Sequence, residues 1–363
     1  MAPTESGVLE ALKTVVDPNT GKDFVSTKQL KNLRIEGGDI AFEVELGYPA
    51  ASQIAALRAD LVAAARRVPG VSNVSVALQS KVTAHAVQRG VQLLPGVKNI
   101  VAVASGKGGV GKSTTTVNLA LALAAEGARV GILDADVYGP SQPTMMGLSG
   151  RPESADGKTI EPLVNYGVRV MSIGFLVEAD QAMIWRGPMA TQALDQLLRQ
   201  TNWGDLDYLM VDMPPGTGDI ALTLSQRVPL TGAVIVTTPQ DIALLDAKKG
   251  LTMFEKVNVP ILGIVENMSV YVCPNCGHSE HIFGADGGKR MAEQYKVEYL
   301  GALPLNLSIR EQADSGHPTV VADPDGEIAR VYKQVARRVA VSIAGKSRDF
   351  SAKFPTITVS KHT

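Results

Sequence analysis

A glycine-rich segment at residues 106–114 constrains the fold more than any other feature. Its sequence is Gly106-Lys107-Gly108-Gly109-Val110-Gly111-Lys112-Ser113-Thr114. An apolar run at residues 100–104 precedes it, and residues 114–125 have the composition of a helix that ends at Gly127. Glycines let backbone N–H groups turn inward without Cβ clashes, so that they surround phosphate oxygens at a helix N-terminus. This strand–loop–helix order predicts a P-loop, with residues 106–114 as the nucleotide-binding segment for ATP.

Two residues of this loop have predicted chemical roles. We expect Lys112 to be catalytic by reaching the β- and γ-phosphates, and to have no role in the core of the protein. We expect Ser113 to be a ligand of the magnesium ion that accompanies ATP.

Three aspartates follow apolar runs and extend the predicted site. Asp134 and Asp136 come after the run at residues 130–133, and Asp212 comes after the run at residues 208–211. Ligands of open α/β sheets bind at the carboxyl ends of strands. We therefore predict that Asp134 and Asp212 hold magnesium, through water, and that Asp136 is catalytic by positioning the attacking water. Each could instead be a helix cap or a solvated charge.

The order of apolar and helical segments predicts the fold class. From residue 98 to 345, short runs that are apolar on both faces alternate with helical patterns, as in a buried parallel sheet. The runs cover residues 100–104, 130–133, 208–211, 233–236, 261–265 and 299–303. We predict a doubly wound α/β P-loop domain with a mostly parallel sheet.

Residues 1–80 have a different pattern, which predicts a small α+β domain. Two alternating stretches around Gly37-Gly38 predict a β-hairpin, and Ser52 is a possible cap of a helix that reaches Val68. Residues 81–97 are the expected linker. Residues 346–363 are polar, contain Pro355 and are expected to be a loosely ordered tail.

Charge and hydropathy exclude some classes of function. The formal net charge is -1, which does not favour nucleic acid or an anionic membrane as a partner. The N-terminus lacks the basic and apolar regions of a signal peptide, and no apolar stretch reaches the roughly 18 residues of a membrane-spanning helix. We expect a cytoplasmic protein.

The segment 271–278 contains both cysteines of the chain, as Tyr271-Val272-Cys273-Pro274-Asn275-Cys276-Gly277-His278. A Cys-x-x-Cys turn followed by glycine directs two thiolates at one metal. A four-iron cluster takes four thiolates, and a two-fold dimer would supply them from two chains. A zinc ion held with His278 and His281, a zinc ion bridging a dimer, and a redox pair remain open.

Several motifs resemble those of one ATPase family. Lys107, the second residue of the loop, is typical of the deviant Walker-A class, which includes the MinD and ParA ATPases. Within this class the chain resembles the Mrp/ApbC family of iron–sulfur cluster carrier proteins. The resemblance spans nearly all of the second domain, and the first domain resembles a small domain often fused ahead of it. The matching segments are residues 134–141, 212–219, 266–269, 273–277 and 301–305.

The resemblance implies an ATP-dependent homodimer that binds a four-iron cluster between two subunits. It implies that Lys107 is catalytic by reaching across the interface to the partner's nucleotide. It also implies that residues 134–141 and 212–219 are switch regions, and that Asn267 contacts adenine. Cys273 and Cys276 would bind the cluster.

The predicted function is an ATPase that receives a cluster from an assembly scaffold and transfers it to apo-proteins. Two alternatives are a positioning ATPase of the MinD or ParA kind and a cytosolic ATPase with a structural zinc. The positioning ATPase leaves the cysteine pair unexplained. Its membrane-bound versions also need a basic amphipathic helix, which the Pro355-containing tail does not provide.

Overall fold

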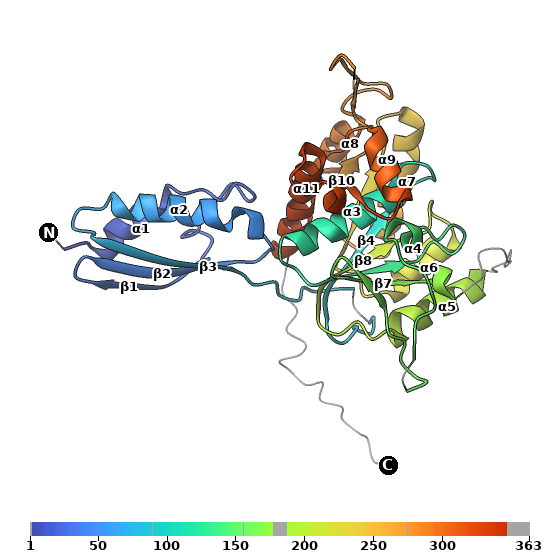
Figure 1. The fold of residues 1–363 in the computed structure, drawn as a ribbon, viewed down its shortest axis with the longest axis horizontal. Coiled ribbons are helices and arrows are strands. Elements are labelled where there is room, and N and C mark those ends of the chain that lie inside the picture. Colours follow the sequence, from blue (N-terminus) through green and yellow to red (C-terminus); the bar gives the residue numbers. More distant parts are fainter. Residues whose placement is uncertain (1, 89, 155, 177–186, 274, 347–363) are drawn as a thin grey trace, which may run out of the picture.

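A computed structural model describes residues 2–88, 90–154, 156–176, 187–273 and 275–346. Figure 1 shows two units, with the N-terminal unit beside the larger unit and helix α11 next to their junction. Apart from Lys346, the predicted tail lies outside the described residues.

The N-terminal unit is a three-stranded sheet covered by two helices, as the α+β prediction requires. Strands β1 and β2 form the predicted antiparallel hairpin, and β3 adds to β2 in parallel. Valine, leucine and isoleucine side chains of the β2 strand and of both helices are buried between the layers. The elements are α1 (Glu5–Lys13), β1 (Leu30–Glu36), β2 (Asp39–Leu46), a 3-10 turn (Ala51–Gln53), α2 (Ile54–Arg66) and β3 (Asn73–Ser80).

The prediction that Ser52 caps this helix is wrong. Ser52 lies inside the 3-10 turn, and the residue that precedes α2 makes no side-chain cap. The hydroxyl of Ser52 instead donates to the Glu126 carboxylate in the larger unit. Ser52, which the local pattern assigned to the helix end, therefore makes a contact between the two units instead.

The larger unit is built on an eight-stranded sheet with the order β13-β10-β9-β4-β8-β5-β7-β6. Neighbouring strands are parallel except for β6 and β7. All six predicted runs are strands of this sheet. The strands are β4 (Val97–Ala104), β5 (Val130–Asp134), β6 (Leu163–Asn165), β7 (Val168–Ser172), β8 (Leu206–Asp212), β9 (Gly232–Thr237), β10 (Ile261–Glu266) and β13 (Tyr299–Ala302).

Helices cover the sheet in two layers, which confirms the doubly wound α/β prediction. Helix α3 packs against α11 on one side, while α5, α6 and α7 form a second group (Figure 1). The helices are α3 (Lys112–Ala125), α4 (Gln142–Met145), α5 (Gly187–Gln200), α6 (Asp219–Arg227), α7 (Asp241–Lys256), α8 (Gly287–Tyr295), α9 (Leu307–Asp314), α10 (Thr319–Ala322) and α11 (Glu327–Ala344), with a 3-10 turn at Ile173–Phe175. Among the helices described, none is long and apolar enough to cross a membrane.

The strand order brings the predicted P-loop and the predicted aspartates together at the carboxyl ends of neighbouring strands. Strand β4 lies between β8 and β9, and β5 lies on the other side of β8. The carboxyl ends of β4, β5 and β8 are therefore adjacent, and the loop at residues 105–111 leaves β4 at this edge. A small hairpin of β11 (Tyr271–Val272) and β12 (Ser279–Glu280) follows β10.

Candidate functional site

The glycines of the loop are required by close contacts and by backbone conformation. Gly109 and Gly111 have φ angles of 82° and 81°, a region that side chains with a Cβ rarely adopt. A Cβ on Gly111 would lie 2.2 Å from the Asn267 amide nitrogen, and one on Gly106 would lie 2.0 Å from the backbone of Asp246. This loop leads directly into α3, so its backbone has the form of a phosphate-binding nest.

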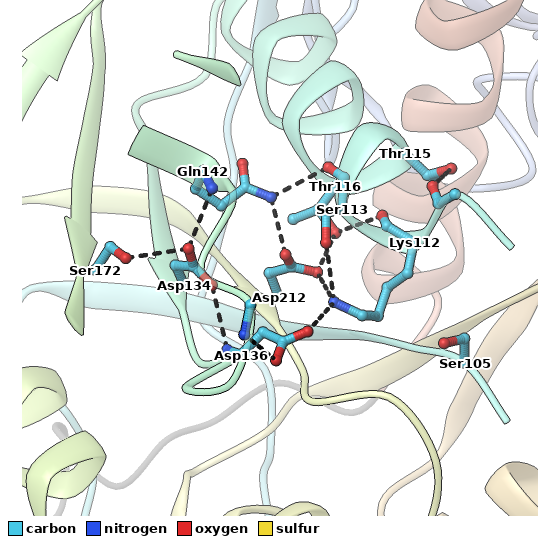
Figure 2. A network of polar contacts seen from close by, with 12 residues as sticks. Ser105, Lys112, Ser113, Thr115, Thr116, Asp134, Asp136, Gln142, Ser172 and Asp212 are labelled. Atoms are coloured by element: carbon cyan, nitrogen blue, oxygen red, sulfur yellow. Dashed lines mark hydrogen bonds and ion pairs between the residues drawn. The ribbon is translucent and has the colours of Figure 1, made fainter. Parts of the chain in front are cut away.

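Lys112 lies inside the site, at the start of α3. Its ammonium nitrogen is 2.5 Å from the Asp212 carboxylate, 3.1 Å from the Ser113 hydroxyl and 3.8 Å from the Asp136 carboxylate. Figure 2 shows the side chain directed toward these acidic groups. The side chain is 6% exposed, so the expectation that Lys112 has no role in the core is wrong. The reason is that the same ammonium neutralises buried carboxylates at the strand ends.

Strand register brings two of the predicted aspartates side by side. Asp134 and Asp212 are paired across β5 and β8, and both are fully buried. Asp136 lies two residues beyond the end of β5, and its carboxylate accepts from the Gly139 backbone N–H. Asp212 and Asp136 therefore face the Lys112 ammonium, and Asp134 lies beside Asp212 on the neighbouring strand end.

Three polar side chains that sequence reasoning missed hold these carboxylates. Gln142 donates its amide to Asp212 at 2.9 Å and its backbone N–H to Asp134 at 3.1 Å. Thr116 donates to Asp212, and Ser172 donates to Asp134, both at 3.1 Å. The available signal was weak: Gln142 directly follows the acidic motif, whereas Ser172 reaches the site only through strand pairing of β7 with β5 (Figure 2).

The donors fit a nucleotide-bound magnesium ion. No set of three His, Cys, Asp or Glu side chains in the described ranges forms a ready metal site. Magnesium suits such a place, because it binds proteins through one or two carboxylates together with substrate phosphates and water. Asp134, Asp212 and the Ser113 hydroxyl would hold it, and it would neutralise phosphate charge there.

Burial and mutual repulsion change the acidity of the aspartates. Burial, followed by the nearby charge of Asp212, raises the pKa of Asp134 to about 7. Burial also raises the pKa of Asp136, while the Lys112 ammonium opposes this effect. The folded protein thus binds a proton at Asp134 more tightly than an unfolded chain does.

We expect this proton to make stability depend on pH. Because folding raises the pKa of Asp134 from 3.8 to about 7, the folded state loses stability as pH rises through this window. Asp134→Asn should therefore be more stable than the wild type above pH 7, by on the order of 4 kcal/mol. Below pH 4 the variant should have no advantage. Denaturant unfolding of the metal-free proteins between pH 4 and 8 measures the difference, with the exposed Asp314→Asn as control. If the stability of wild type and of Asp134→Asn changed with pH in the same way, the raised pKa of Asp134 would be contradicted.

The other two predicted nucleotide contacts lie at the edges of the loop. The Lys107 side chain is half-buried, and its carbonyl accepts from the Ser105 hydroxyl. The Asn267 amide is buried and donates to the Val110 carbonyl at 2.9 Å. Asn267 is thus a structural contact of the P-loop, in addition to the adenine contact predicted for it.

The cysteine pair closes the hairpin of β11 and β12. The Cys273 backbone N–H donates to the His278 carbonyl, and Gly277, with a φ of 72°, donates back to the Cys273 carbonyl. Cys273 is half-buried and Cys276 is exposed. The backbone N–H of Asn275 and then that of Cys276 lower the pKa of the Cys273 thiol, which favours the thiolate that binds metals.

Among the described residues, no histidine or carboxylate completes a zinc site with the two cysteines of one chain. The Nδ1 atom of His281 lies 2.6 Å from the Ser269 carbonyl, to which it must donate, since a carbonyl oxygen only accepts. Within the described residues, no third ligand stands with Cys273 and Cys276 as a metal-binding set. The described residues therefore place two thiols close together at the surface.

Comparisons with known proteins identify the family of the chain. A family model described as NUBPL iron-transfer P-loop NTPase matches residues 96–340, and one described as iron–sulfur cluster assembly protein matches residues 5–76. The iron–sulfur cluster carrier protein of Escherichia coli K12 is 63% identical over 249 residues, 68% of each chain. The protein of the same name from Haemophilus influenzae is 49% identical and covers 94% of this chain and 93% of its own.

Solved structures show the same fold. The nucleotide-binding protein from Archaeoglobus fulgidus in complex with ADP is 39% identical, with a TM-score of 0.56, over 64% of this chain and 90% of its own. The cell division ATPase MinD from Pyrococcus furiosus has a TM-score of 0.51 at 23% identity, over 66% of this chain and 98% of its own, which shows the fold alone. With a P-loop, converging strand-end aspartates and a Cys-x-x-Cys hairpin on one scaffold, the chain belongs to the NUBPL-type family of iron-transfer P-loop NTPases, the iron–sulfur cluster carriers.

Proposed function

We propose that this chain works as a cytoplasmic homodimer that carries one four-iron cluster between its subunits. Cys273 and Cys276 of each subunit hold the cluster, which is cargo received from assembly scaffolds and passed to apo-proteins. ATP binds at residues 106–114 with magnesium at Ser113, Asp134 and Asp212. Lys107, Lys112 and Asp136 act in hydrolysis, Lys107 across the dimer interface, and Asn267 contacts adenine.

The proposal rests on one short segment that joins the P-loop to the cysteine hairpin. Residues 266–272 run from the end of β10 to the cysteine hairpin. At one end Asn267 bonds to the P-loop carbonyl of Val110 and lies against Gly111. Two residues further on, the Ser269 carbonyl accepts from His281, which lies beyond the cysteines. Only one residue separates Asn267 from Ser269, so a shift of the P-loop on nucleotide binding is transmitted directly to the hairpin.

The middle of this segment is conformationally constrained. Met268 has a φ of 56°, an uncommon conformation for a residue with a side chain. Ser269 is held by two bonds to the Leu303 carbonyl, and β11 is bridged to Leu305. Because the segment is fixed at both ends, only a few backbone conformations are open to it. It can therefore switch between distinct conformations rather than move gradually. A nucleotide can shift such an element only by binding its arrangements with different affinity.

We expect His281→Ala to uncouple the cysteines from the nucleotide. In the wild-type protein without cluster, ATP with magnesium should change the alkylation rate of the cysteines by about fivefold or more, the scale of a coupling of about 1 kcal/mol. In His281→Ala the change should fall below about twofold, because the bond to Ser269 is lost, while ATP binding stays intact. Mass spectrometry of the alkylated peptide provides the rate.

His278→Ala is the matched control, since this exposed histidine lies on the same hairpin and accepts from the Cys273 N–H with its backbone carbonyl, which the substitution keeps. It should keep the wild-type response. Loss of the response in both variants, or in neither, would remove the segment as the link between the two sites.

Exposed apolar side chains support a dimer on this side of the molecule. Ile242 and Leu245 on α7 are 69% and 61% exposed, and Val272 and Ile282 flank the cysteine turn. Helix α7 also supplies the backbone against which Gly106 packs. Large exposed apolar groups are typical of protein–protein contact sites. A two-fold contact here would bring both P-loops and both cysteine pairs toward the interface.

We expect Asp136→Asn to slow ATP turnover while nucleotide binding is kept. Asp136 lies 3.8 Å from the Lys112 ammonium, and it is the least buried of the three aspartates, which suits contact with an attacking water. Its loss should lower kcat by about 100-fold, the lower range for one acid–base group, with KM within about threefold. Steady-state kinetics on the dimer measures both. An equal loss of binding and turnover would instead make Asp136 part of the metal site.

We also propose that residues 1–80 and 98–345 are separate domains joined by residues 81–97. Each has its own sheet, and different family models match the two parts. The small domain contains no cysteine, so its role is recognition of partners or regulation rather than thiolate binding.

A further inference from the structure

A cleft between the two units is set apart from the nucleotide and cysteine sites. Its volume is about 960 Å³, and its walls come from residues 19–22, 27–31 and 45–48 of the small unit, Lys81 and Thr83 just after it, and residues 298–300 and 338–346 of the large unit. The cleft lies at the C-terminal end of α11, whereas the P-loop lies at the N-terminal end of α3.

Buried polar contacts fix the two walls relative to each other. Glu126, at the end of α3, forms a buried ion pair with Arg337 of α11. The backbone N–H and hydroxyl of Ser52 both donate to the Glu126 carboxylate, and Arg337 donates to the Asn19 side chain at 3.3 Å. Asn19 also lines the cleft. Separation of the units would expose this network, so the cleft is a built feature of the fold.

The lining of the cleft is strongly basic. Six lysine or arginine side chains face two carboxylates there, although the whole chain has a net charge of -1. One lysine is paired with a lining carboxylate, Lys81 with Glu45. Among the described residues, four further lysines have no carboxylate within ion-pair distance: Lys22, Lys28, Lys31 and Lys346. Burial lowers the pKa of Lys346, which is half-buried and would gain from an anionic partner.

The kind of cationic group favours a ligand with distributed charge. Compact phosphates bind at helix N-termini, glycine-rich nests or arginine forks. This cleft instead has the C-terminal end of α11, where a helix carries partial negative charge. Within the described ranges, its cations without a carboxylate partner are four lysines and Arg338, and the Arg338 guanidinium already donates to the Leu300 carbonyl at 3.1 Å. Because these cations stand on both walls, several carboxylates along a polypeptide match them better than one phosphate group does.

The chain's own tail does not have the charge for this place. Residues 347–363 contain Arg348, Lys353 and Lys361 against a single acid, Asp349. A basic segment gains nothing from a basic cleft. We propose that the cleft between the two units binds an acidic polypeptide segment of a partner protein.

This inference deepens the proposed carrier function, because a carrier must dock other proteins, but peptide binding requires neither cluster nor hydrolysis. The test uses full-length protein with Mg-ADP filling the P-loop and a fluorescent peptide of ten glutamates as probe. The double variant Lys31→Glu/Lys346→Glu changes one lysine on each wall. It should bind the peptide at least about tenfold more weakly than the wild type, and wild-type affinity should fall as salt rises.

The matched control is Lys158→Glu/Lys289→Glu, which makes the same change of charge at two exposed lysines outside the cleft. It should bind like the wild type. Equal weakening in both double variants would show a general charge effect and overturn the proposal. So would full displacement of the peptide by equimolar pyrophosphate, which would assign the cleft to small phosphates. ATP hydrolysis by the cleft variant should stay at the wild-type rate, which separates failure of this proposal from failure of the carrier function.

Discussion

Lys112→Ala should lower the rate of ATP hydrolysis by at least about 100-fold, the usual effect of removing one preorganised charge-stabilising group. The Lys112 ammonium is the cation nearest to the converging aspartates, 2.5 Å from Asp212. Without it, the loop loses the cation that would neutralise phosphate charge beside these carboxylates, and the acidic groups repel the nucleotide. Phosphate release assays with saturating magnesium measure the loss.

The same variant should also lose stability, because a buried carboxylate is left without its partner. Breaking a buried ion pair from one side costs about 3–5 kcal/mol. Lys112→Gln separates the two effects, since its amide still donates to Asp212 but has no charge. It should fold better than Lys112→Ala and hydrolyse ATP no faster. The exposed Lys289→Ala is the control, and a normal hydrolysis rate in folded Lys112→Gln would sink the site assignment.

Cys273→Ser and Cys276→Ser should each abolish cluster binding while ATP affinity stays within about twofold of the wild type. Each chain has two thiolates, so one substitution leaves a dimer with two of the four that a cluster needs. The hairpin forms through backbone bonds between Cys273, Gly277 and His278, so serine should not unfold it.

His278→Ala again provides the control for the cysteine variants. Its ring has no role in a four-thiolate cluster, so absorption spectra and iron content should match the wild type. If His278→Ala instead released the metal as strongly as a cysteine substitution does, the ligand set would be that of a mononuclear zinc site.

Much of the fold follows from local pattern. Buried parallel strands are apolar on both faces, which made the six runs from residue 100 to 303 visible in the sequence. Strands β6 and β7 were not predicted, because Leu163–Asn165 is short and half-exposed and Val168–Ser172 contains Arg169. The first strand of the small unit was predicted as part of a hairpin, because the alternation of apolar and polar residues and the turn at Gly37-Gly38 both indicate one.

The site was predictable where one motif carries the chemistry, and it was missed where tertiary register does. The P-loop and the cysteine turn each occupy a few consecutive residues. Gln142 and Ser172 reach Asp134 only because β5 pairs with β7 and α4 begins beside it. The link from Asn267 to Val110 joins residues 157 positions apart, which no local pattern reveals.

The contact between the units shows the same limit. Ser52 has the local features of a helix cap, but its hydroxyl is bonded to Glu126, 74 positions away. The buried carboxylate holds the hydroxyl whose oxygen would otherwise accept from a backbone N–H at the helix end, because leaving a buried charge unpaired costs more than losing a cap.

The bridging cluster is the central claim, and its stoichiometry tests it most directly. Protein reconstituted with iron and sulfide under strict anaerobic conditions should be analysed for iron, sulfide, zinc and mass in solution. We predict about four iron and four sulfide for every two chains, in a particle with the mass of a dimer. One zinc per chain without sulfide, or a full cluster on a monomer, would contradict the account.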